Sequence, residues 1–155
     1  MTVTFAERGE KREIEEGEQL APKFDAEGLI PVVAVDAGTG RPLMLAFMND
    51  EALKRTIETR HAHYYSRSRK KLWKKGEESG HVQHVEQLLV DCDQDAVVMR
   101  VDMRGAAACH VGYGSCFYRE IALGDGAGEG DAPAALRYVE HEKRFNPDEV
   151  YGKKG

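Results

Sequence analysis

The sequence predicts a mostly β protein of the α+β class, built as a single domain around one main helix. Three observations support this prediction. The chain has 155 residues, which is enough for one domain with a substantial core. Apolar residues make up 41% and charged residues 32%, a composition typical of globular proteins. Short β-branched apolar runs outnumber the segments with helical patterning.

The first expected elements are a β-hairpin and the main helix. The apolar, β-branched run at 29–35 is typical of a strand. Turn residues separate it from a second apolar run at 43–48, so the two strands are expected to pair. Asn49 or Asp50 can then cap a helix over residues 51–59.

The following segments predict further short strands. Residues 61–80 mix aromatic with cationic side chains, which indicates short strands and loops. Strand-like patterns return at 82–90, 97–103 and 116–122. The intervening stretch at 104–115 is rich in Gly and Ala, and we expect it to form a loop.

Both ends of the chain differ in composition from its middle. Residues 1–23 are a charged extension that we expect to be partly helical. The predicted domain covers residues 24–123, and residues 124–155 follow as a Gly-rich linker and a helical tail. Within that tail, the composition predicts a flexible linker at 124–131 and a short helix at 133–145.

The charge and hydropathy of the chain bear on its partners and its location. The formal net charge is −5, which disfavours a dedicated nucleic-acid binder because phosphate neutralisation needs clustered cations. No apolar run approaches the roughly 20 residues that span a bilayer. The N-terminus also lacks the apolar core of a signal peptide. We therefore expect a cytoplasmic protein with no nucleic-acid partner and no membrane partner.

Three aspartates at alternate positions, Asp91, Asp93 and Asp95, form the most informative segment. On a strand they would share one face, where their mutual repulsion raises their proton affinity unless a cation compensates. A hard cation such as magnesium suits these oxygen ligands. A solvated acidic turn is the alternative. An EF-hand loop is disfavoured, because Ala96 stands where it needs Gly and Asp102 where it needs Glu.

The chain has three cysteines, Cys92, Cys109 and Cys116. An odd number in a cytosolic protein argues against a disulfide framework and leaves buried thiols, a reactive thiol or metal ligands. Three thiolates would leave a fourth zinc position open, as in catalytic zinc sites. His110 is then a fourth ligand, a proton-transfer group or a surface histidine. On a strand, Cys92 would point away from the aspartates that flank it.

A basic, aromatic segment at 64–76 is the third feature with chemical meaning. Arg offers a bidentate fork for phosphate, and Ser adds hydroxyl donors. An exposed basic strand pair and a surface for single-stranded nucleic acid are the alternatives. Trp73 can stack on a purine or belong to the core. The candidates for substrate binding in this segment are Ser66, Arg67, Ser68, Arg69, Trp73, Lys74 and Lys75.

Three long motifs follow one another along the chain: YYSRSRKKLWKKGEESGHVQ, VDCDQDAVVMRV and AACHVGYGSCFYRE. In these motifs the sequence resembles the phosphoribosyl-AMP cyclohydrolases, across roughly residues 24–120. The resemblance implies a hydrolase that performs the third step of histidine biosynthesis. That reaction adds water at C6 of the adenine ring of phosphoribosyl-AMP and then breaks the C6–N1 bond.

The resemblance also implies the site residues, the cofactors and the assembly. It assigns Cys92, Cys109 and Cys116 to zinc. It assigns the three aspartates to magnesium, and it makes His110 the expected catalytic base. It further implies an intertwined homodimer in which both subunits contribute to the zinc site.

Overall fold

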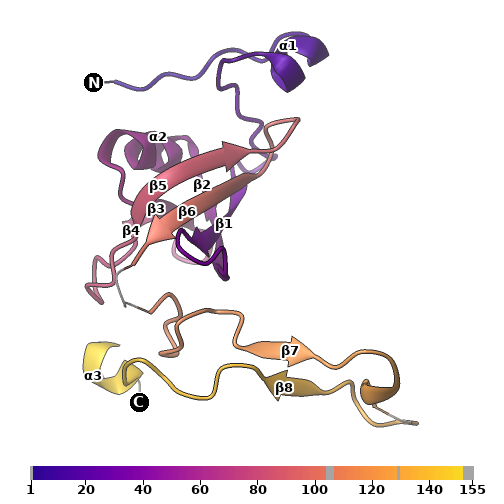
Figure 1. Cartoon of the computed structure of the whole chain (residues 1–155). Coiled ribbons are helices and arrows are strands. Elements are labelled where there is room, and N and C mark those ends of the chain that lie inside the picture. Colours follow the sequence, from indigo (N-terminus) through magenta and orange to yellow (C-terminus); the bar gives the residue numbers. More distant parts are fainter. Residues whose placement is uncertain (1, 104–106, 129, 152–155) are drawn as a thin grey trace.

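A twisted four-stranded sheet forms the centre of the molecule (Figure 1). The computed structural model describes residues 2–103, 107–128 and 130–151. The strand order is β2–β1–β6–β5, with β1 parallel to β6 and the other two pairings antiparallel. The strands of this sheet are β1 (Ile30–Asp36), β2 (Pro42–Met48), β5 (His84–Val90) and β6 (Val97–Asp102).

The main helix, α2 (Asp50–Thr59), packs against the core side of the sheet. It begins where the Asn49 side chain accepts a hydrogen bond of 2.8 Å from the Ala52 backbone N–H. This is the cap expected from the sequence. The buried Thr56 hydroxyl then accepts a hydrogen bond of 2.9 Å from the His63 backbone N–H. That bond ties the helix to the strand that follows it.

Alternate residues of the two central strands fill the core. Because successive side chains of a strand point to opposite faces, every second residue faces the helix. These side chains are almost completely buried and form the centre of the hydrophobic core, whose burial stabilises the fold. The buried residues of β1 and β6 are Ile30, Val32, Ala34, Val97, Met99 and Val101.

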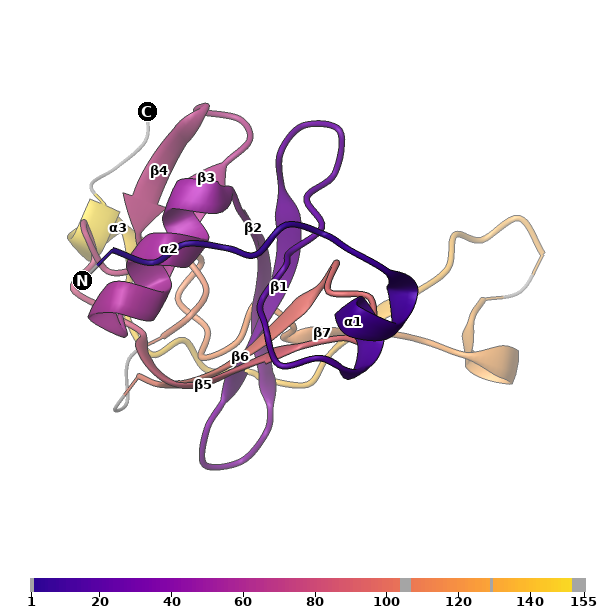
Figure 2. The ribbon, with the colours of Figure 1, turned by 90° about the horizontal axis from the view of Figure 1, so that it is seen from above.

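A two-stranded ribbon lies beside α2 and the outer edge of β2 (Figure 2). It consists of β3 (His63–Ser66) and β4 (Lys71–Lys74), which pair antiparallel. Tyr64 anchors the ribbon, because its ring is fully buried and its hydroxyl donates a hydrogen bond to the side chain of Gln83.

The C-terminal part of the chain forms a protruding arm and then turns back toward the cleft described below (Figure 1). The helix expected at 133–145 is wrong. A strand occupies the middle of that range, because pairing with a distant strand outweighs the helix propensity of its Ala-rich start. Its elements are β7 (Arg119–Ile121), the 3₁₀ turn η1 (Gly124–Gly126), β8 (Leu136–Tyr138) and the helix α3 (Pro147–Tyr151).

The N-terminal extension packs on the tip of the β5–β6 hairpin and contains the short helix α1 (Lys11–Glu16). Gln94, at the tip, is buried and makes the main connection. Its side chain accepts a hydrogen bond of 2.8 Å from the Ala21 backbone N–H and donates one of 3.0 Å to the Ile14 carbonyl. Arg8 adds a hydrogen bond of 3.1 Å to the Asp93 carbonyl.

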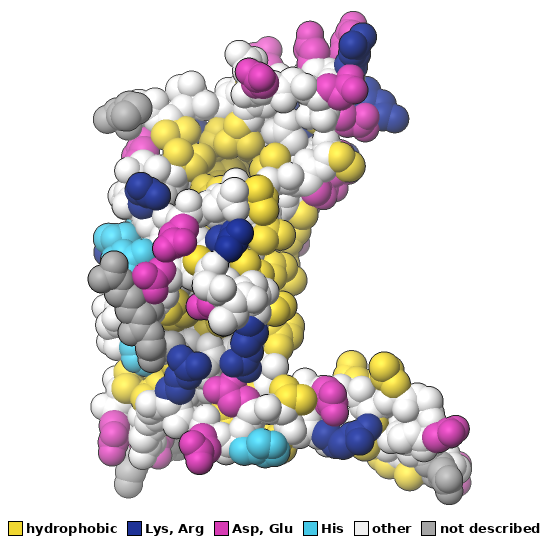
Figure 3. Space-filling view, in the orientation of Figure 1, with side chains coloured by type: hydrophobic (Ala, Val, Ile, Leu, Met, Phe, Trp, Pro, Cys, Tyr) yellow, Lys and Arg dark blue, Asp and Glu magenta, His cyan; other side chains and the backbone are white. Residues whose placement is uncertain are grey.

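An apolar row crosses the outer face of the sheet, on the side away from α2. The strand register aligns Leu45, Val33, Val98 and Leu89 across β2, β1, β6 and β5. Leu45, Leu89 and Val98 are 52%, 46% and 38% exposed. Figure 3 shows hydrophobic side chains gathered along the hollow side of the molecule, between the N-terminal segment and the β7–β8 arm. Exposed apolar faces of this kind mark interaction surfaces.

The structure confirms the mostly β, α+β class with few helices. The hairpin and the main helix lie within a residue or two of their expected bounds. None of the helices in the described part of the chain is long and apolar enough to cross a membrane.

Candidate active site

A cleft of about 810 Å³ opens between β2, the β3–β4 ribbon, the loop of residues 107–118 and the C-terminal segment. We call residues 107–118 the cysteine loop. Leu45 and Phe47 of β2 line one side of the cleft, and His110 and Cys116 reach it from the cysteine loop. A volume of this size is usual for small-molecule sites.

The turn at 66–69, here named the basic turn, carries four of the predicted substrate contacts and lines the cleft. The Ser66 hydroxyl accepts a hydrogen bond of 3.2 Å from the Arg69 backbone N–H, which closes the turn. The Arg67 guanidinium lies 4.0 Å from the centre of the Phe47 ring. Because guanidinium and hydroxyl groups both donate to phosphate oxygens, the basic turn can bind a phosphate group.

Trp73 and Lys74, on β4, line the same cleft and are half-buried. The Trp73 ring packs against the buried Tyr64 ring with 5.0 Å between the ring centres. The Arg69 guanidinium lies 6.0 Å from the centre of the Trp73 ring. Trp73 therefore belongs both to the core and to the wall of the cleft.

Lys75 differs from the other predicted substrate contacts because its side chain is buried. Only 7% of the residue is exposed, and its ammonium donates a hydrogen bond of 2.7 Å to the Ala108 carbonyl. Burial lowers the pKa of Lys75, whereas the nearby thiols of Cys116 and Cys109 act in the opposite direction. Its charge faces the cysteine loop and is held there by that hydrogen bond.

The cysteine loop brings Cys109 and Cys116 together. A hydrogen bond of 2.7 Å from the Cys116 backbone N–H to the Leu43 carbonyl attaches the loop to β2. The Cys116 thiol donates to the Cys109 sulfur and, together with the Val111 N–H, lowers the pKa of Cys109 to about 6. The same bond raises the pKa of Cys116. A thiolate beside a second thiol is a soft donor pair of the kind that binds zinc.

The third cysteine lies at the other end of the sheet. Cys92 is exposed in the turn that precedes β6, whereas Cys109 lies in the loop that follows β6 (Figure 1). β6 has six residues, so about 20 Å of strand separates the two ends. One chain therefore places His110 and Cys116 at the same cleft, with Cys109 beside Cys116, and leaves Cys92 remote from them.

The three aspartates gather in the turn between β5 and β6, at residues 91–95. Their carboxylate oxygens lie within 4.8 Å of one another. Of the two conformations that the sequence left open, a strand face and an acidic turn, the segment adopts the turn, with Gln94 at a φ of +56°. The Asp91 carboxylate accepts hydrogen bonds of 3.0 and 3.2 Å from the Asp95 and Ala96 N–H groups. The turn, rather than strand alternation, brings the carboxylates together.

Within the cluster, the pKa values of Asp91 and Asp95 are shifted in opposite directions. Burial raises the pKa of Asp91, but the backbone hydrogen bonds from Asp95 and Ala96 outweigh it and leave that pKa lowered. Hydrogen bonds to Asp93 and Asp91 raise the pKa of Asp95 to about 6. Below about pH 6 the cluster therefore retains a proton on Asp95, which a bound divalent cation would displace.

The cleft also contains residues that sequence reasoning missed. Tyr65 lies within the basic, aromatic segment, and Glu77 and Glu78 follow it directly. The cationic residues of that segment indicated a phosphate site but did not indicate the other residues that line the cleft. Asp148 and Tyr151 come from α3. No pattern in the sequence marks these two, because only the path of the folded chain brings them to the cleft.

The fold and the cleft together define a small α+β enzyme that holds thiols and a histidine near a basic turn. The family model described as phosphoribosyl-AMP cyclohydrolase matches residues 44–118. Curated proteins of that name are similar across nearly the whole chain. One from Rhodopseudomonas palustris (strain TIE-1) is 61% identical, covering 91% of this chain and 90% of its own length. Another from strain BisB5 is 53% identical over 99% of this chain and its whole length.

A relative from Nitrobacter winogradskyi with the same name is 56% identical over 90% of this chain and 92% of its own length. The chain belongs to the phosphoribosyl-AMP cyclohydrolase family. Family membership favours the enzyme over the nucleic-acid-binding and thiol-redox alternatives.

Proposed function

We propose that the chain opens the adenine ring of phosphoribosyl-AMP in this cleft, with zinc and magnesium as cofactors and as a homodimer. As a member of the family, it has phosphoribosyl-AMP cyclohydrolase activity in histidine biosynthesis. One observation carries the proposal. A single cleft joins Cys116 and His110 to the basic turn, with Cys109 hydrogen-bonded to Cys116.

The cleft has both cationic and aromatic lining residues, and the substrate has phosphate groups and a base to match them. Phosphoribosyl-AMP carries two phosphate groups with the reacting ring between them. The arginines and serines of the basic turn, with Lys74, supply donors for phosphate oxygens. Tyr65 and Phe47 supply flat apolar surface on which a base can stack.

Zinc fits the cysteine loop, because Cys109 is already disposed to ionise beside Cys116. In the proposal Cys109, Cys116 and Cys92 hold the zinc, and the bound metal would lower the pKa of a water to about 7. His110 lines the cleft next to this pair and accepts a proton from the attacking water.

The reaction then proceeds at C6 of the ring. The water oxygen bonds to C6, and the electron pair of the C6–N1 bond moves to N1. The new hydroxyl loses its proton and becomes the carbonyl of a carboxamide, while N1 gains a proton. In the proposal His110, which lines the cleft, carries that proton from the oxygen side to N1.

Magnesium fits the aspartate turn for a different reason. Asp91, Asp93 and Asp95 present hard oxygen donors close together, and the raised pKa of Asp95 shows that the cluster lacks a counter-charge. Because this turn lies beside Cys92 at the far end of β6, a magnesium ion there would in the proposal engage a phosphate of the substrate held in the cleft of a second copy.

A homodimer would explain why Cys92 is remote from the other two cysteines. The apolar row gives a second copy a surface to cover, and it crosses the sheet from Leu45 at the cleft to Leu89 on β5. In the proposed dimer, Cys92 of one copy completes the zinc site formed by Cys109 and Cys116 of the other. A cytoplasmic location also remains a prediction.

Turnover of phosphoribosyl-AMP, followed by ultraviolet absorbance, tests the proposal. We expect ring opening that a chelator abolishes and that added zinc and magnesium restore. In the same assay, His110→Ala should lower kcat by about 10²- to 10⁴-fold while zinc content stays normal. Loss of zinc in that variant would make His110 a ligand. Absence of turnover by the folded, metal-supplied protein would overturn the proposed substrate.

A further inference from the structure

The C-terminal segment at 139–151 packs tightly against the cysteine loop, although it lies outside the region that the family model matches. Glu140 makes two of the contacts. Its carboxylate accepts a hydrogen bond of 2.8 Å from the Gly114 N–H and pairs at 2.7 Å with the Arg41 guanidinium. The Arg144 backbone N–H donates a hydrogen bond of 2.7 Å to the Gly112 carbonyl. The segment is thus joined to the loop at Gly112 and Gly114, and Arg41, just before β2, holds the same Glu140 carboxylate.

Two glycines of the loop show how close this approach is. A Cβ atom on Gly112 would lie 2.5 Å from the Phe145 carbonyl oxygen. One on Gly114 would lie 2.6 Å from Nε of Arg144. Real Cβ atoms do not approach backbone so closely, so the loop requires a glycine at 112, where φ is also +112°, whereas at Gly114 the Arg144 side chain could move aside. The contact therefore depends both on Gly112 of the loop and on Arg144 and Phe145 of the segment.

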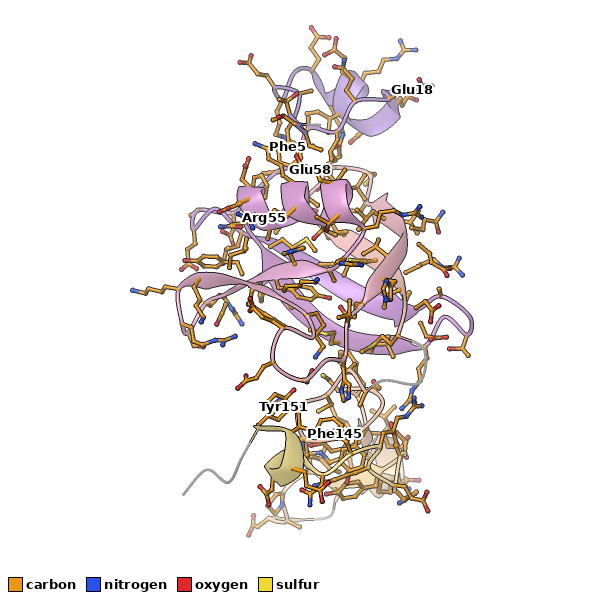
Figure 4. The ribbon with its side chains drawn as sticks, turned by 90° about the vertical axis from the view of Figure 1, so that its left-hand side faces the viewer. Phe5, Glu18, Arg55, Glu58, Phe145 and Tyr151 are labelled. Atoms are coloured by element: carbon orange, nitrogen blue, oxygen red, sulfur yellow. The ribbon has the colours of Figure 1, made fainter. Side chains whose placement is uncertain are left out.

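The end of the segment then forms part of the cleft wall. Pro147, Asp148 and Tyr151 of α3 line the cleft that also contains His110 and Cys116. Figure 4 shows Tyr151 and Phe145 at the seam between the C-terminal segment and the ribbon above it. The Phe145 ring meets the ring of His81 edge-on with 4.8 Å between centres, which holds this end of the segment against the rest of the chain.

We propose that residues 139–151 form a strap that is a working part of the active site. Glu140 is a positioning residue that holds the cysteine loop, and Tyr151 and Asp148 are specificity-determining residues that contact the reacting base. The substrate contacts rest on the proposed function. A ring alkylated at N1 carries positive charge, which suits a carboxylate and an aromatic face, whereas the phosphates suit the basic turn.

Substitutions within α3 test the specificity residues. Tyr151→Ala and Asp148→Asn should each raise the KM for phosphoribosyl-AMP about tenfold with kcat within about twofold, as expected for lost stacking or charge pairing at the base. Glu149→Gln is the matched control, because it removes a carboxylate from the same helix outside the cleft. Unchanged KM in both variants would overturn this part of the proposal.

Loss of zinc to a chromogenic chelator tests the positioning role without any substrate. Glu140→Ala should speed zinc loss about tenfold. Glu140→Gln should restore most of the retention, because its amide oxygen still accepts from the Gly114 N–H. Glu142→Ala, an exposed change on the same segment, should behave like the unmodified chain. Equal rates for Glu140→Ala and the unmodified chain would overturn the positioning role.

The two proposals fail in different ways. If the unmodified chain does not turn over phosphoribosyl-AMP, the proposed function fails, and the zinc-loss comparison still decides whether the strap holds the cysteine loop. If the unmodified chain turns over phosphoribosyl-AMP, but the α3 variants leave KM unchanged and Glu140→Ala leaves zinc loss unchanged, the proposed role of the strap is refuted and the proposed function stands.

Discussion

Lys75 directly follows β4. The contacts of its side chain say more about its role than the fact that it is a lysine. The sequence suggests a phosphate contact, as for any lysine in a basic segment. In the fold its ammonium is buried, hydrogen-bonded to Ala108 and close to Cys109 and Cys116. A cation in this position favours the thiolate form of the cysteine pair. Lys75 lines the cleft, and its ammonium is held toward the cysteine loop by the hydrogen bond to Ala108.

This placement predicts a change in thiol ionisation. Cys109 owes its lowered pKa first to the Cys116 thiol and also to the charge of Lys75. Ultraviolet absorbance of the metal-free protein should show a thiolate forming as the pH rises through about 6. In Lys75→Met this midpoint should move to higher pH, yet remain below the ordinary thiol value of about 8.5.

Lys71→Met, an exposed change on β4, is the control and should leave the midpoint in place. An unchanged midpoint in Lys75→Met would show that the lysine charge does not reach the thiols. The burial that creates this effect could not be predicted from the sequence, because the contact joins residues 33 positions apart.

At the scale of elements, the hairpin tip between β5 and β6 depends on one buried side chain. Gln94 has a φ of +56° and connects the tip to the N-terminal extension through hydrogen bonds to Ala21 and Ile14. The sequence showed Gln94 only as a spacer between aspartates. Its bonds hold the turn that gathers the three carboxylates.

Gln94→Ala should lower the free energy of unfolding by about 2–4 kcal/mol, because it removes these hydrogen bonds and leaves their backbone partners unsatisfied, while the Cβ keeps the left-handed conformation that Gln94 already has. Chemical denaturation measures this loss, and calorimetry should show weaker magnesium binding. Gln94→Gly accepts the positive φ and isolates the side-chain contribution. A loss below about 0.5 kcal/mol in both variants would contradict the anchoring role, and Gln87→Ala on the exposed side of β5 is the control.

Local patterning predicted the elements that depend on local rules. The first hairpin and α2 follow from apolar runs, turn residues and the Asn49 cap, and the structure confirms them. The C-terminal part could not be predicted in this way. There an Ala-rich run favours helix, but β8 pairs with β7 across a long connection, and the helix forms only at 147–151. Tertiary pairing decides such segments.

At the scale of the whole molecule, the proposed site requires two copies of the chain. Motif recognition indicates the cysteines, but one chain cannot bring Cys92 to Cys109, because β6 stands between them. The apolar row supplies the surface that a second copy would cover. The assembly is therefore the part of the proposed site that only an experiment on mixed subunits can establish.

Mixing two inactive variants tests this arrangement. Cys92→Ser and Cys109→Ser should each be inactive and low in zinc. When they are unfolded together and refolded, mixed dimers should recover one intact site, with Cys92 from one copy and Cys109 and Cys116 from the other. Activity should return to about a quarter of normal when half of the dimers are mixed. No recovery, with mixed dimers demonstrated by mass, would refute a shared site.

The β7–β8 arm should differ from the central sheet in how fast its backbone amides exchange. A two-stranded ribbon is only marginally stable in water, and this one exposes Ile121, Leu123 and Leu136 at 66%, 81% and 52%. In an isolated chain its backbone amides would exchange with solvent deuterium far sooner than those of the central sheet. A second copy lying over the arm would slow that exchange. The rate of deuterium exchange in the arm would therefore report on dimer assembly, and it can be measured without metal or substrate.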